Sequence, residues 1–280
     1  MAMSTAANSG GPVLTPEQVH SLVVQPLIEQ SVAAQVSTVI QTTSHDLRVP
    51  RVTQDPSAAW TLEGAEINVS DAVLDELTMT PKKLAVLVVI SNAIANDSSP
   101  AALGVVGQGL VRDLRPKIDA AYFTATTANG PSGLGSLTTS TAPNGGSWAT
   151  LDSFEAAKSA AETLHTEITS FVTSPATALT LSTLKQFGTA GSNMPLLSPD
   201  PTQPTARTIS GVPMYVSPAV AADLVWAIPR DHSLFVLRQD STVVTDSSVF
   251  FTKDSVAVRA TLRVAFGFTY PLAVVKITKA

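Results

Sequence analysis

The chain has 280 residues, a formal net charge of −5 and no cysteine, and only 14% of its residues are charged against 44% hydrophobic. Globular domains carry roughly 25% charged residues, so this composition excludes a disordered chain, and the missing cysteine excludes a disulfide scaffold or a thiolate metal site. The longest apolar run, residues 84–90, is far shorter than the ~20 residues of a membrane-spanning helix. Residues 1–5 lack the basic and apolar regions of a signal peptide, so we expect neither a membrane partner nor export.

The low charge has two interpretations. Mean hydropathy is positive, at +0.23, although no segment is long enough to span a membrane. Either the composition has drifted toward Ala, Ser, Thr and Val, or much of the surface is covered by other copies of the same chain. Composition alone leaves both interpretations open.

A flexible arm followed by a helix is predicted at the N-terminus. Residues 1–14 are small and polar, with two glycines and a proline. Thr15 suits an N-cap and Pro16 the first helical position. Apolar residues then recur at helical spacing as far as Ile40, so a helix is predicted to that residue, and Pro26 is expected to kink or split it.

Extended structure is predicted for residues 46–80. Residues 47–52 resemble a short strand, which Pro50 confines to a sheet edge. Residues 58–67 and 73–80 are predicted to pair as a long hairpin around the Asn/Ser/Asp turn at 68–71. The polar sides of this hairpin indicate that it need not lie inside a core.

A buried strand and a long helix follow. Residues 84–90 are continuously apolar, which predicts a strand buried on both faces. Ser99 and Pro100 suit the start of a helix. Its expected apolar stripe consists of Leu103, Val106, Leu110, Leu114, Ile118 and Tyr122.

The C-terminal half mixes helices and strands irregularly. After a Gly/Ser/Thr/Pro loop at 129–146, a capping-box-like pair, Asp152 and Glu155, predicts a helix. Further predicted elements are a strand at 170–173, a helix capped by Ser174, a strand at 209–217, an alternating strand at 256–266 and a buried strand at 273–277. This order favours an α+β fold over a regular βαβ repeat.

No motif for catalysis, a cofactor or a metal is found. The glycines at 104–109 stand in the wrong order for a dinucleotide site, and no phosphate-binding loop occurs. Residues 231–233, Asp-His-Ser, are adjacent and therefore cannot form a relay, so a turn is expected. The four histidines are scattered, and basic residues do not cluster. We therefore expect no enzyme, no cofactor and no sequence-specific nucleic-acid binding.

An ordered set of short segments resembles a known family. Trp60-Thr61-Leu62-Glu63-Gly64-Ala65-Glu66-Ile67 is followed by Ser70-Asp71 and by Thr80-Pro81-Lys82-Lys83-Leu84-Ala85, which runs into an apolar strand ending at Ser91-Asn92 and then Asp97-Ser98-Ser99. Residues 129–134, 171–175, 211–217 and the closing alternating strands continue the match. Together, from Val19 to the C-terminus, these segments resemble the major capsid proteins of tailed bacteriophages, which have the Hong Kong 97-type shell fold.

The resemblance implies an α+β, Hong Kong 97-type capsid fold. Its parts would be an N-terminal arm and helix (1–45), an extended β-hairpin loop region (46–84), a peripheral domain with a long spine helix and long strands (85–127 and 239–280), and an axial domain with a central sheet (128–238). The implied function is structural: pentamers and hexamers assemble into an icosahedral shell around double-stranded DNA, in the host bacterial cytoplasm, and the protein ends in the virion. Implied partners are further copies of the chain, a separate scaffolding protein, a portal, a maturation protease, DNA contacted non-specifically and, as a further candidate, a decoration protein.

Seven residues are candidates for the subunit interface. Trp60, on a polar hairpin beside a glycine, is either core or an intersubunit anchor, and we favour the anchor. Glu63 and Glu66 are either solvated or paired with Arg259 or Arg263 of a neighbour. The remaining candidates, Lys82 and Lys83, lie at the base of the loop.

Two departures from the family pattern matter. Some members weld their shells by an isopeptide bond from a lysine on the extended loop, but residues 61–80 contain no lysine, so no weld is expected. The short N-terminal arm leaves no room for a fused scaffolding domain. The alternatives are an encapsulin shell of the same fold, a hydrolase-like enzyme without a recognisable motif, and a trimeric tail or fibre protein.

Overall fold

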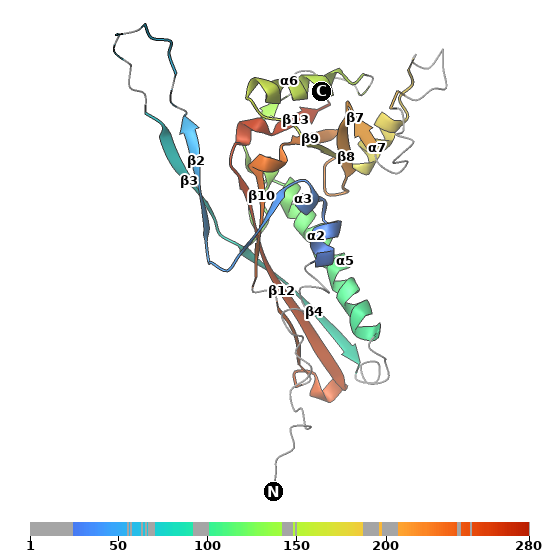
Figure 1. Cartoon of the computed structure of the whole chain (residues 1–280). Coiled ribbons are helices and arrows are strands. Elements are labelled where there is room, and N and C mark those ends of the chain that lie inside the picture. The colour runs from blue at the N-terminus through green and yellow to red at the C-terminus, as the bar shows by residue number, and fades with distance from the viewer. Residues whose placement is uncertain are drawn as a thin grey trace.

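The computed structural model contains one five-stranded sheet, one six-stranded sheet and a separate two-stranded ribbon (Figure 1). It describes residues 25–54, 56, 58–62, 64, 66, 71–91, 101–141, 148, 150–186, 196–197, 207–239, 242–246 and 248–279. The predicted N-terminal arm and the helix start at Thr15 lie outside these residues. Helices and strands are mixed without a βαβ repeat, which agrees with the predicted α+β class.

The predicted N-terminal helix is interrupted at Ser31 rather than at Pro26, and it ends before Ile40, which belongs to a strand. Two short helices, α2 (Gln25–Gln30) and α3 (Val32–Gln35), are separated by Ser31, whose extended backbone makes it the N-cap of α3. Strand β1 (Thr38–Thr42) follows at once and pairs in parallel with β10 (Ser233–Arg238). The apolar residues up to Ile40 fit the spacing of a helix and also that of a buried strand. They form a strand because they pair with β10.

The five-stranded sheet is built around one long strand. Strand β12 (Ser255–Phe268) pairs antiparallel with β4 (Lys82–Ser91) along one edge, and with β11 (Thr242–Asp246) and β10 along the other. The alternating strand predicted at 256–266 is confirmed. The prediction that β4 is buried on both faces is wrong, because Leu87 and Val89 are 58% and 47% exposed.

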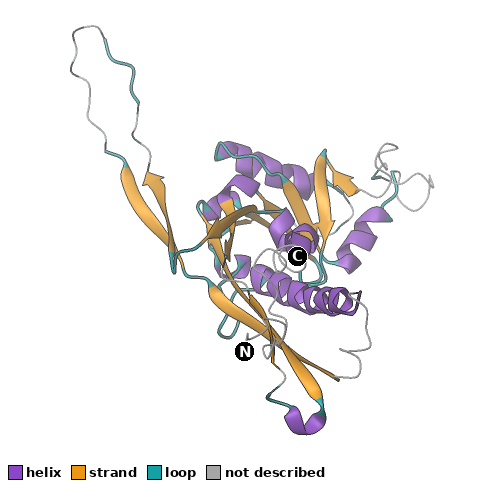
Figure 2. Ribbon diagram, turned by 60° about the horizontal axis from the view of Figure 1, so that its bottom comes forward, coloured by secondary structure: helices purple, strands orange, loops and turns teal. Residues whose placement is uncertain are grey.

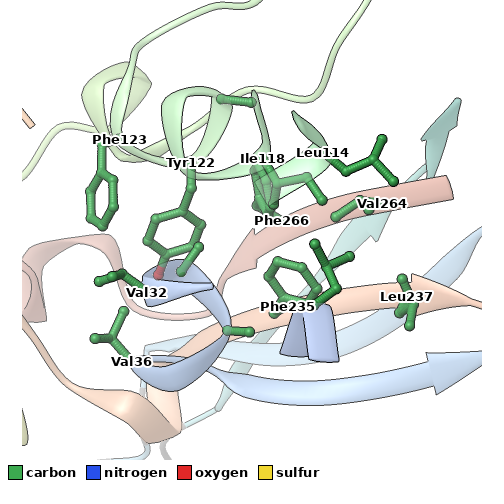
Figure 3. Packing of buried hydrophobic residues seen from close by; sticks show 14 of the residues in the cluster. Val32, Val36, Leu114, Ile118, Tyr122, Phe123, Phe235, Leu237, Val264 and Phe266 are labelled. Carbon is green, nitrogen blue, oxygen red and sulfur yellow. The ribbon is translucent and has the colours of Figure 1, made fainter. Parts of the chain in front are cut away.

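Helix α5 (Ala101–Phe123) lies along one face of this sheet (Figure 2). The predicted stripe is confirmed for Leu110, Leu114, Ile118 and Tyr122, which are all buried. They belong to the same core as Phe235, Leu237, Val264 and Phe266 of the sheet. Figure 3 shows Leu114, Ile118 and Tyr122 of α5 beside these residues. Burial of each such side chain contributes about 1.5–3 kcal/mol. Leu103 and Val106, and the predicted cap at Ser99, lie outside the side chains that the structure describes.

Buried polar groups join the N-terminal segment to α5. Tyr122 is fully buried and lies 2.7 Å, oxygen to oxygen, from Ser37, while burial raises the pKa of its hydroxyl to about 12. One turn earlier, Asp119 Oδ1 accepts hydrogen bonds from Ser31 Oγ at 2.7 Å and from the Ala33 N–H at 3.1 Å. Asp119 therefore caps α3 from the side of α5. Its burial raises the pKa of the carboxyl above the ordinary 3.8, although these hydrogen bonds oppose the shift.

The substitution Asp119→Asn should remove a pH dependence of stability. Because the pKa of Asp119 is raised in the folded chain, the folded state binds the proton more tightly, and the free energy of unfolding should fall as pH rises from about 4 through the raised value. Asparagine keeps the accepting oxygen without the charge, so the slope should flatten. Asp119→Ala should instead cost about 1–3 kcal/mol, because the buried donors lose their acceptor. Urea unfolding of the unassembled chain at several pH values measures both, and an unchanged slope in Asp119→Asn would contradict the assignment.

The six-stranded sheet lies beyond the end of α5. Its order is β5 (Ser140–Thr141), β13 (Val275–Thr278), β9 (Leu224–Ile228), β6 (Ser170–Thr173), β8 (Val212–Val216) and β7 (Arg207–Ile209). Helices α6 (Asp152–Thr163) and α7 (Pro175–Ser182) accompany it, and Phe154 of α6 packs edge-on against Phe171 of β6 at 5.1 Å between ring centres. A second hydrophobic core lies between these elements.

Two local predictions for this region need correction, and one is confirmed. The predicted capping box of α6 does not form, since the N-cap is Leu151 and makes no side-chain cap. The single strand predicted at 209–217 is a hairpin, because Ser210 and Gly211 both take positive φ, as a two-residue I′-type turn requires. Ser174 does cap α7, accepting from the Thr177 N–H.

Candidate intersubunit surfaces

The ribbon formed by β2 (Leu47–Gln54) and β3 (Val73–Met79) projects from the body of the molecule (Figures 1 and 2). Its two strands pair antiparallel from Leu47 with Met79 outward, with a bulge near Gln54. The predicted edge strand containing Pro50 is thus confirmed. The predicted partner of β3 is wrong: β3 pairs with β2, and no strand occurs among the described residues of 55–72, which are called the ribbon tip below.

A small hydrophobic cluster holds the base of the ribbon to the five-stranded sheet. Leu47, Val49, Leu77 and Met79 of the ribbon pack with Ile40, Leu234, Val236 and Ala265. Gly267 of β12 leaves the space that the Met79 side chain fills, since a Cβ at this position would overlap the Met79 sulfur. The direction in which the ribbon leaves the body is therefore set by side-chain packing.

The substitution Gly267→Ala should loosen this base. Met79 is buried and must move away from the added methyl group, which should lower the free energy of unfolding by about 1–3 kcal/mol. Adding Met79→Ala should remove the overlap, so the two substitutions together should cost less than the sum of their separate effects. Urea denaturation of the four variants of this cycle measures the coupling, and simple additivity would contradict the packing argument.

Charge pairs hold the middle of the ribbon. Arg51 and Asp75 stand opposite each other in register, and the Arg51 guanidinium donates to Asp75 Oδ2 at 2.6 and 3.0 Å. These hydrogen bonds lower the pKa of the Asp75 carboxyl. Arg48 lies 3.5 Å from Glu76 on the other face. The basic residues of the ribbon are thus satisfied within it, and they leave no cation toward the tip.

The outer part of the ribbon exposes large apolar side chains. Val52 and Leu74 are cross-strand partners, and Leu74 is 69% exposed. In the ribbon tip, Trp60 is fully exposed and Leu62 is 85% exposed. An isolated two-stranded ribbon is marginally stable in water, and contiguous exposed apolar groups mark interaction surfaces. The outer ribbon is therefore a candidate surface for contact with another protein chain.

A second exposed surface is the face of β4 and β12 that α5 does not cover. Lys83 stands opposite Arg263, and Leu87 stands opposite Arg259, in the antiparallel register of the two strands. Arg259 lies near Asp246, whose pKa is lowered first by hydrogen bonds from Ser248 and additionally by this arginine. Apolar and basic groups thus share one sheet face. Because residues 84–90 are all apolar, the sequence did not indicate that one face of this strand is exposed.

The structure brings some of the seven predicted interface residues together and keeps others apart. Lys82 and Lys83 begin β4, and Arg263 of β12 stands opposite Lys83, whereas Arg259 stands opposite Leu87, four residues further along β4. Trp60 and Glu66 are exposed in the ribbon tip, and Glu63 lies outside the described residues. Sequence reasoning missed Val52, Leu74, Leu87 and Val89 as exposed apolar residues, because only strand register shows which face each occupies.

The histidine of the predicted Asp-His-Ser turn packs beside the end of β12. His232 belongs to the 3₁₀ turn η4 (Arg230–His232), and its Nδ1 lies 3.0 Å from Thr269 Oγ1. Among the described residues, no group of His, Asp and Glu is arranged to hold a metal ion, and no helix there has the length and apolarity of a membrane span.

The chain is similar to known proteins in both sequence and fold. The model of the phage capsid family matches residues 11–279. This chain belongs to the phage capsid family. The major capsid protein of Klebsiella oxytoca phage phiKO2 is 30% identical over 124 residues, which cover 44% of this chain and 29% of that protein. The chain thus matches less than a third of the length of this curated relative.

Solved structures share the fold of this phage capsid chain. The capsid of an empty GTA particle matches with a TM-score of 0.69 at 16% identity, covering 100% of this chain and 95% of that one. A protein of Mycobacterium phage Adephagia gives 0.70 at 15% identity, covering 89% and 90%, and one of Microbacterium phage Oxtober96 gives 0.67 at 18%, covering 100% and 96%. The predicted Hong Kong 97-type capsid fold and the phage-shell class are confirmed, and these relatives favour them over the encapsulin alternative.

Proposed function

We propose that this chain is the major capsid protein of a tailed phage, whose copies form the pentamers and hexamers of an icosahedral shell enclosing double-stranded DNA. The observation that carries the proposal is the projecting ribbon, because it exposes Trp60, Leu62 and Leu74 where nothing in the described chain covers them. A ribbon of this shape is stabilised when its apolar outer part lies on an adjacent copy.

The proposed mechanism is the summation of modest contacts. Each copy in a closed symmetric assembly repeats the same interfaces, so small pairwise free energies add up to a stable shell. The proposed role is structural and includes neither a cofactor nor an enzymatic activity. As partners we propose a separate scaffolding protein, a portal, a maturation protease, non-specifically contacted DNA and a decoration protein, with assembly in the bacterial cytoplasm.

The division into an N-terminal region (1–45), an extended loop (46–84), a peripheral domain (85–127 and 239–280) and an axial domain (128–238) stays a prediction. The separate cores of the two sheets support this division. The five-stranded sheet and α5 form one core, and the six-stranded sheet forms another. Two strands pair with a strand of the other proposed domain. Strand β10, within 128–238, pairs with β12, and strand β13, within 239–280, pairs with β9.

Expression of the full chain with its candidate scaffolding protein tests the proposal. We expect material that elutes in the void volume in gel filtration and forms closed, uniform shells in electron micrographs. Denaturing electrophoresis of those shells should show monomers, because the ribbon tip contains no lysine for an isopeptide weld. A monomer at high concentration under all assembly conditions would contradict the proposed function.

A further inference from the structure

Strand β4 forms the longest free sheet edge in the described part of the chain. Its ten residues pair with β12 along one side, and no described strand lies on the other side (Figure 1). Apart from its pairing with β12, no backbone–backbone hydrogen bond between described residues involves residues 82–91. Alternate residues of an edge strand direct their N–H and C=O groups away from the sheet, so about half of the residues of β4 present groups with which another strand can pair.

The other edge strands carry features that block such pairing, and β4 does not. Strands β1 and β11 have five residues each, β7 has three and β5 has two, and the ribbon strands carry Pro50 and the Arg51–Asp75 pair. Short strands, proline and charged side chains are the usual means of protecting an edge. From Leu84 to Ser91, β4 contains no charged residue, no proline and no glycine, so its edge is open to pairing.

Side chains on both faces of β4 lack the cover that a neighbouring strand provides. On the face toward α5, Leu84, Val86 and Val88 pack against the main core but stay partly exposed. On the opposite face, Leu87 and Val89 are exposed. Side chains on adjacent strands stabilise a sheet by covering each other. A strand beside β4 would therefore cover apolar groups on both faces and also pair the free backbone groups.

A second copy of β4 is the strand that fits this edge. In antiparallel pairing, Lys82 and Lys83 of each copy lie beside the uncharged end of the other strand, whereas parallel pairing would place the lysines of the two copies together. A two-fold axis perpendicular to the sheet keeps both α5 helices on the same face, so apolar residues meet apolar residues on each face. The low charge of the chain favours such contact between copies.

We propose that β4 pairs antiparallel with β4 of a second copy about a two-fold axis at Leu87, which joins the two five-stranded sheets into one. Leu87 then stands opposite the partner's Leu87, and Val86 stands opposite the partner's Val88. The contact uses the same surface on both copies and closes at two copies. The inference goes beyond the shell-forming function proposed above, because this pairing can form between two free chains.

Charges introduced at Leu87 test the two-fold contact. Leu87→Lys and Leu87→Glu each place two like charges opposite each other across the axis, so each variant alone should dimerise about tenfold more weakly than the wild type, or weaker still. An equimolar mixture of the two variants should recover the dimer, because opposite charges then meet. Sedimentation velocity of the full chain over a range of concentrations measures the dimer, and circular dichroism establishes that each variant is folded.

An introduced cysteine tests the register, since the chain has no cysteine of its own. Opposite residues of an antiparallel pair lie about 4.5–5.5 Å apart between Cα atoms, within reach of a disulfide, so Leu87→Cys should form a covalent dimer with oxidised glutathione. Arg259→Cys is the matched control, because Arg259 is exposed and stands opposite Leu87 on β12. It would lie three strand spacings, about 14 Å, from its counterpart and should stay monomeric in denaturing electrophoresis.

The outcomes separate this inference from the proposed function. A wild-type chain that forms shells, combined with equal cross-linking of the Leu87→Cys and Arg259→Cys variants, would overturn the inference and leave the proposed function standing. A mixture of Leu87→Lys and Leu87→Glu that associates no better than either variant alone would also overturn the inference. A chain that dimerises through Leu87 but never forms shells would support the inference and contradict the proposed function.

Discussion

Replacing Trp60 by alanine should abolish closed shells while leaving the subunit folded. Trp60 is fully exposed in the ribbon tip and contributes nothing to either hydrophobic core, so its removal should not lower the stability of the chain. A buried aromatic anchor at an interface is worth about 2 kcal/mol or more, which corresponds to an about 30-fold weaker contact. Since every copy uses the contact, the loss is multiplied over the shell.

Gel filtration and electron microscopy measure the assembled fraction, and circular dichroism establishes that the subunit is folded. Trp60→Phe keeps an aromatic ring and should assemble, which makes it the matched control. Trp148 and Trp226 are buried within the subunit, so a blue shift of tryptophan emission on assembly should come from Trp60 and be missing in Trp60→Phe. Normal shells from Trp60→Ala would exclude Trp60 as an anchor.

The substitution Gly133→Ala should strongly destabilise the subunit. The Gly133 backbone lies against the end of α5, where its N–H donates to the Ala125 carbonyl at 3.3 Å. A Cβ here would overlap the carbonyl oxygens of Ala121, Tyr122 and Thr124. Because these are backbone atoms of a packed helix end, they cannot move away as a side chain can. We expect a loss of about 3 kcal/mol or more in the free energy of unfolding.

Gly109→Ala, a substitution within α5 itself, should have the opposite effect on the free energy of unfolding. Nothing outside the helix lies within 4 Å of the position of its Cβ, so alanine should stabilise α5 by about 1 kcal/mol through its higher helix propensity. Urea denaturation of the two variants compares them directly. Equal effects of the two substitutions would contradict the close approach at Gly133.

The long periodic elements of this chain were predictable because their own residues define them. The stripe of α5 and the alternation of β12 follow from spacing alone, since one face of each must be buried. The Ser174 cap and the edge position of Pro50 follow from the hydrogen-bonding capacity of single residues. The family resemblance, the exposed Trp60 and the lysines at the base of the loop likewise depend only on local sequence.

What failed depended on partners distant in the chain. Ile40 belongs to a strand because Val236 lies beside it, and β3 pairs with β2 across the intervening tip, although its predicted partner was nearer in sequence. A pocket lined by Lys82 of β4, Lys117 of α5 and the loop at 124–131 unites distant parts of the chain, so spacing along the sequence could not indicate it. Sequence by itself determined the buried stripe of α5, the alternation of β12 and the charge that each segment carries. Tertiary structure alone decided which strands pair and which charges meet, because pairing free energy depends on neighbours that the chain brings together only on folding.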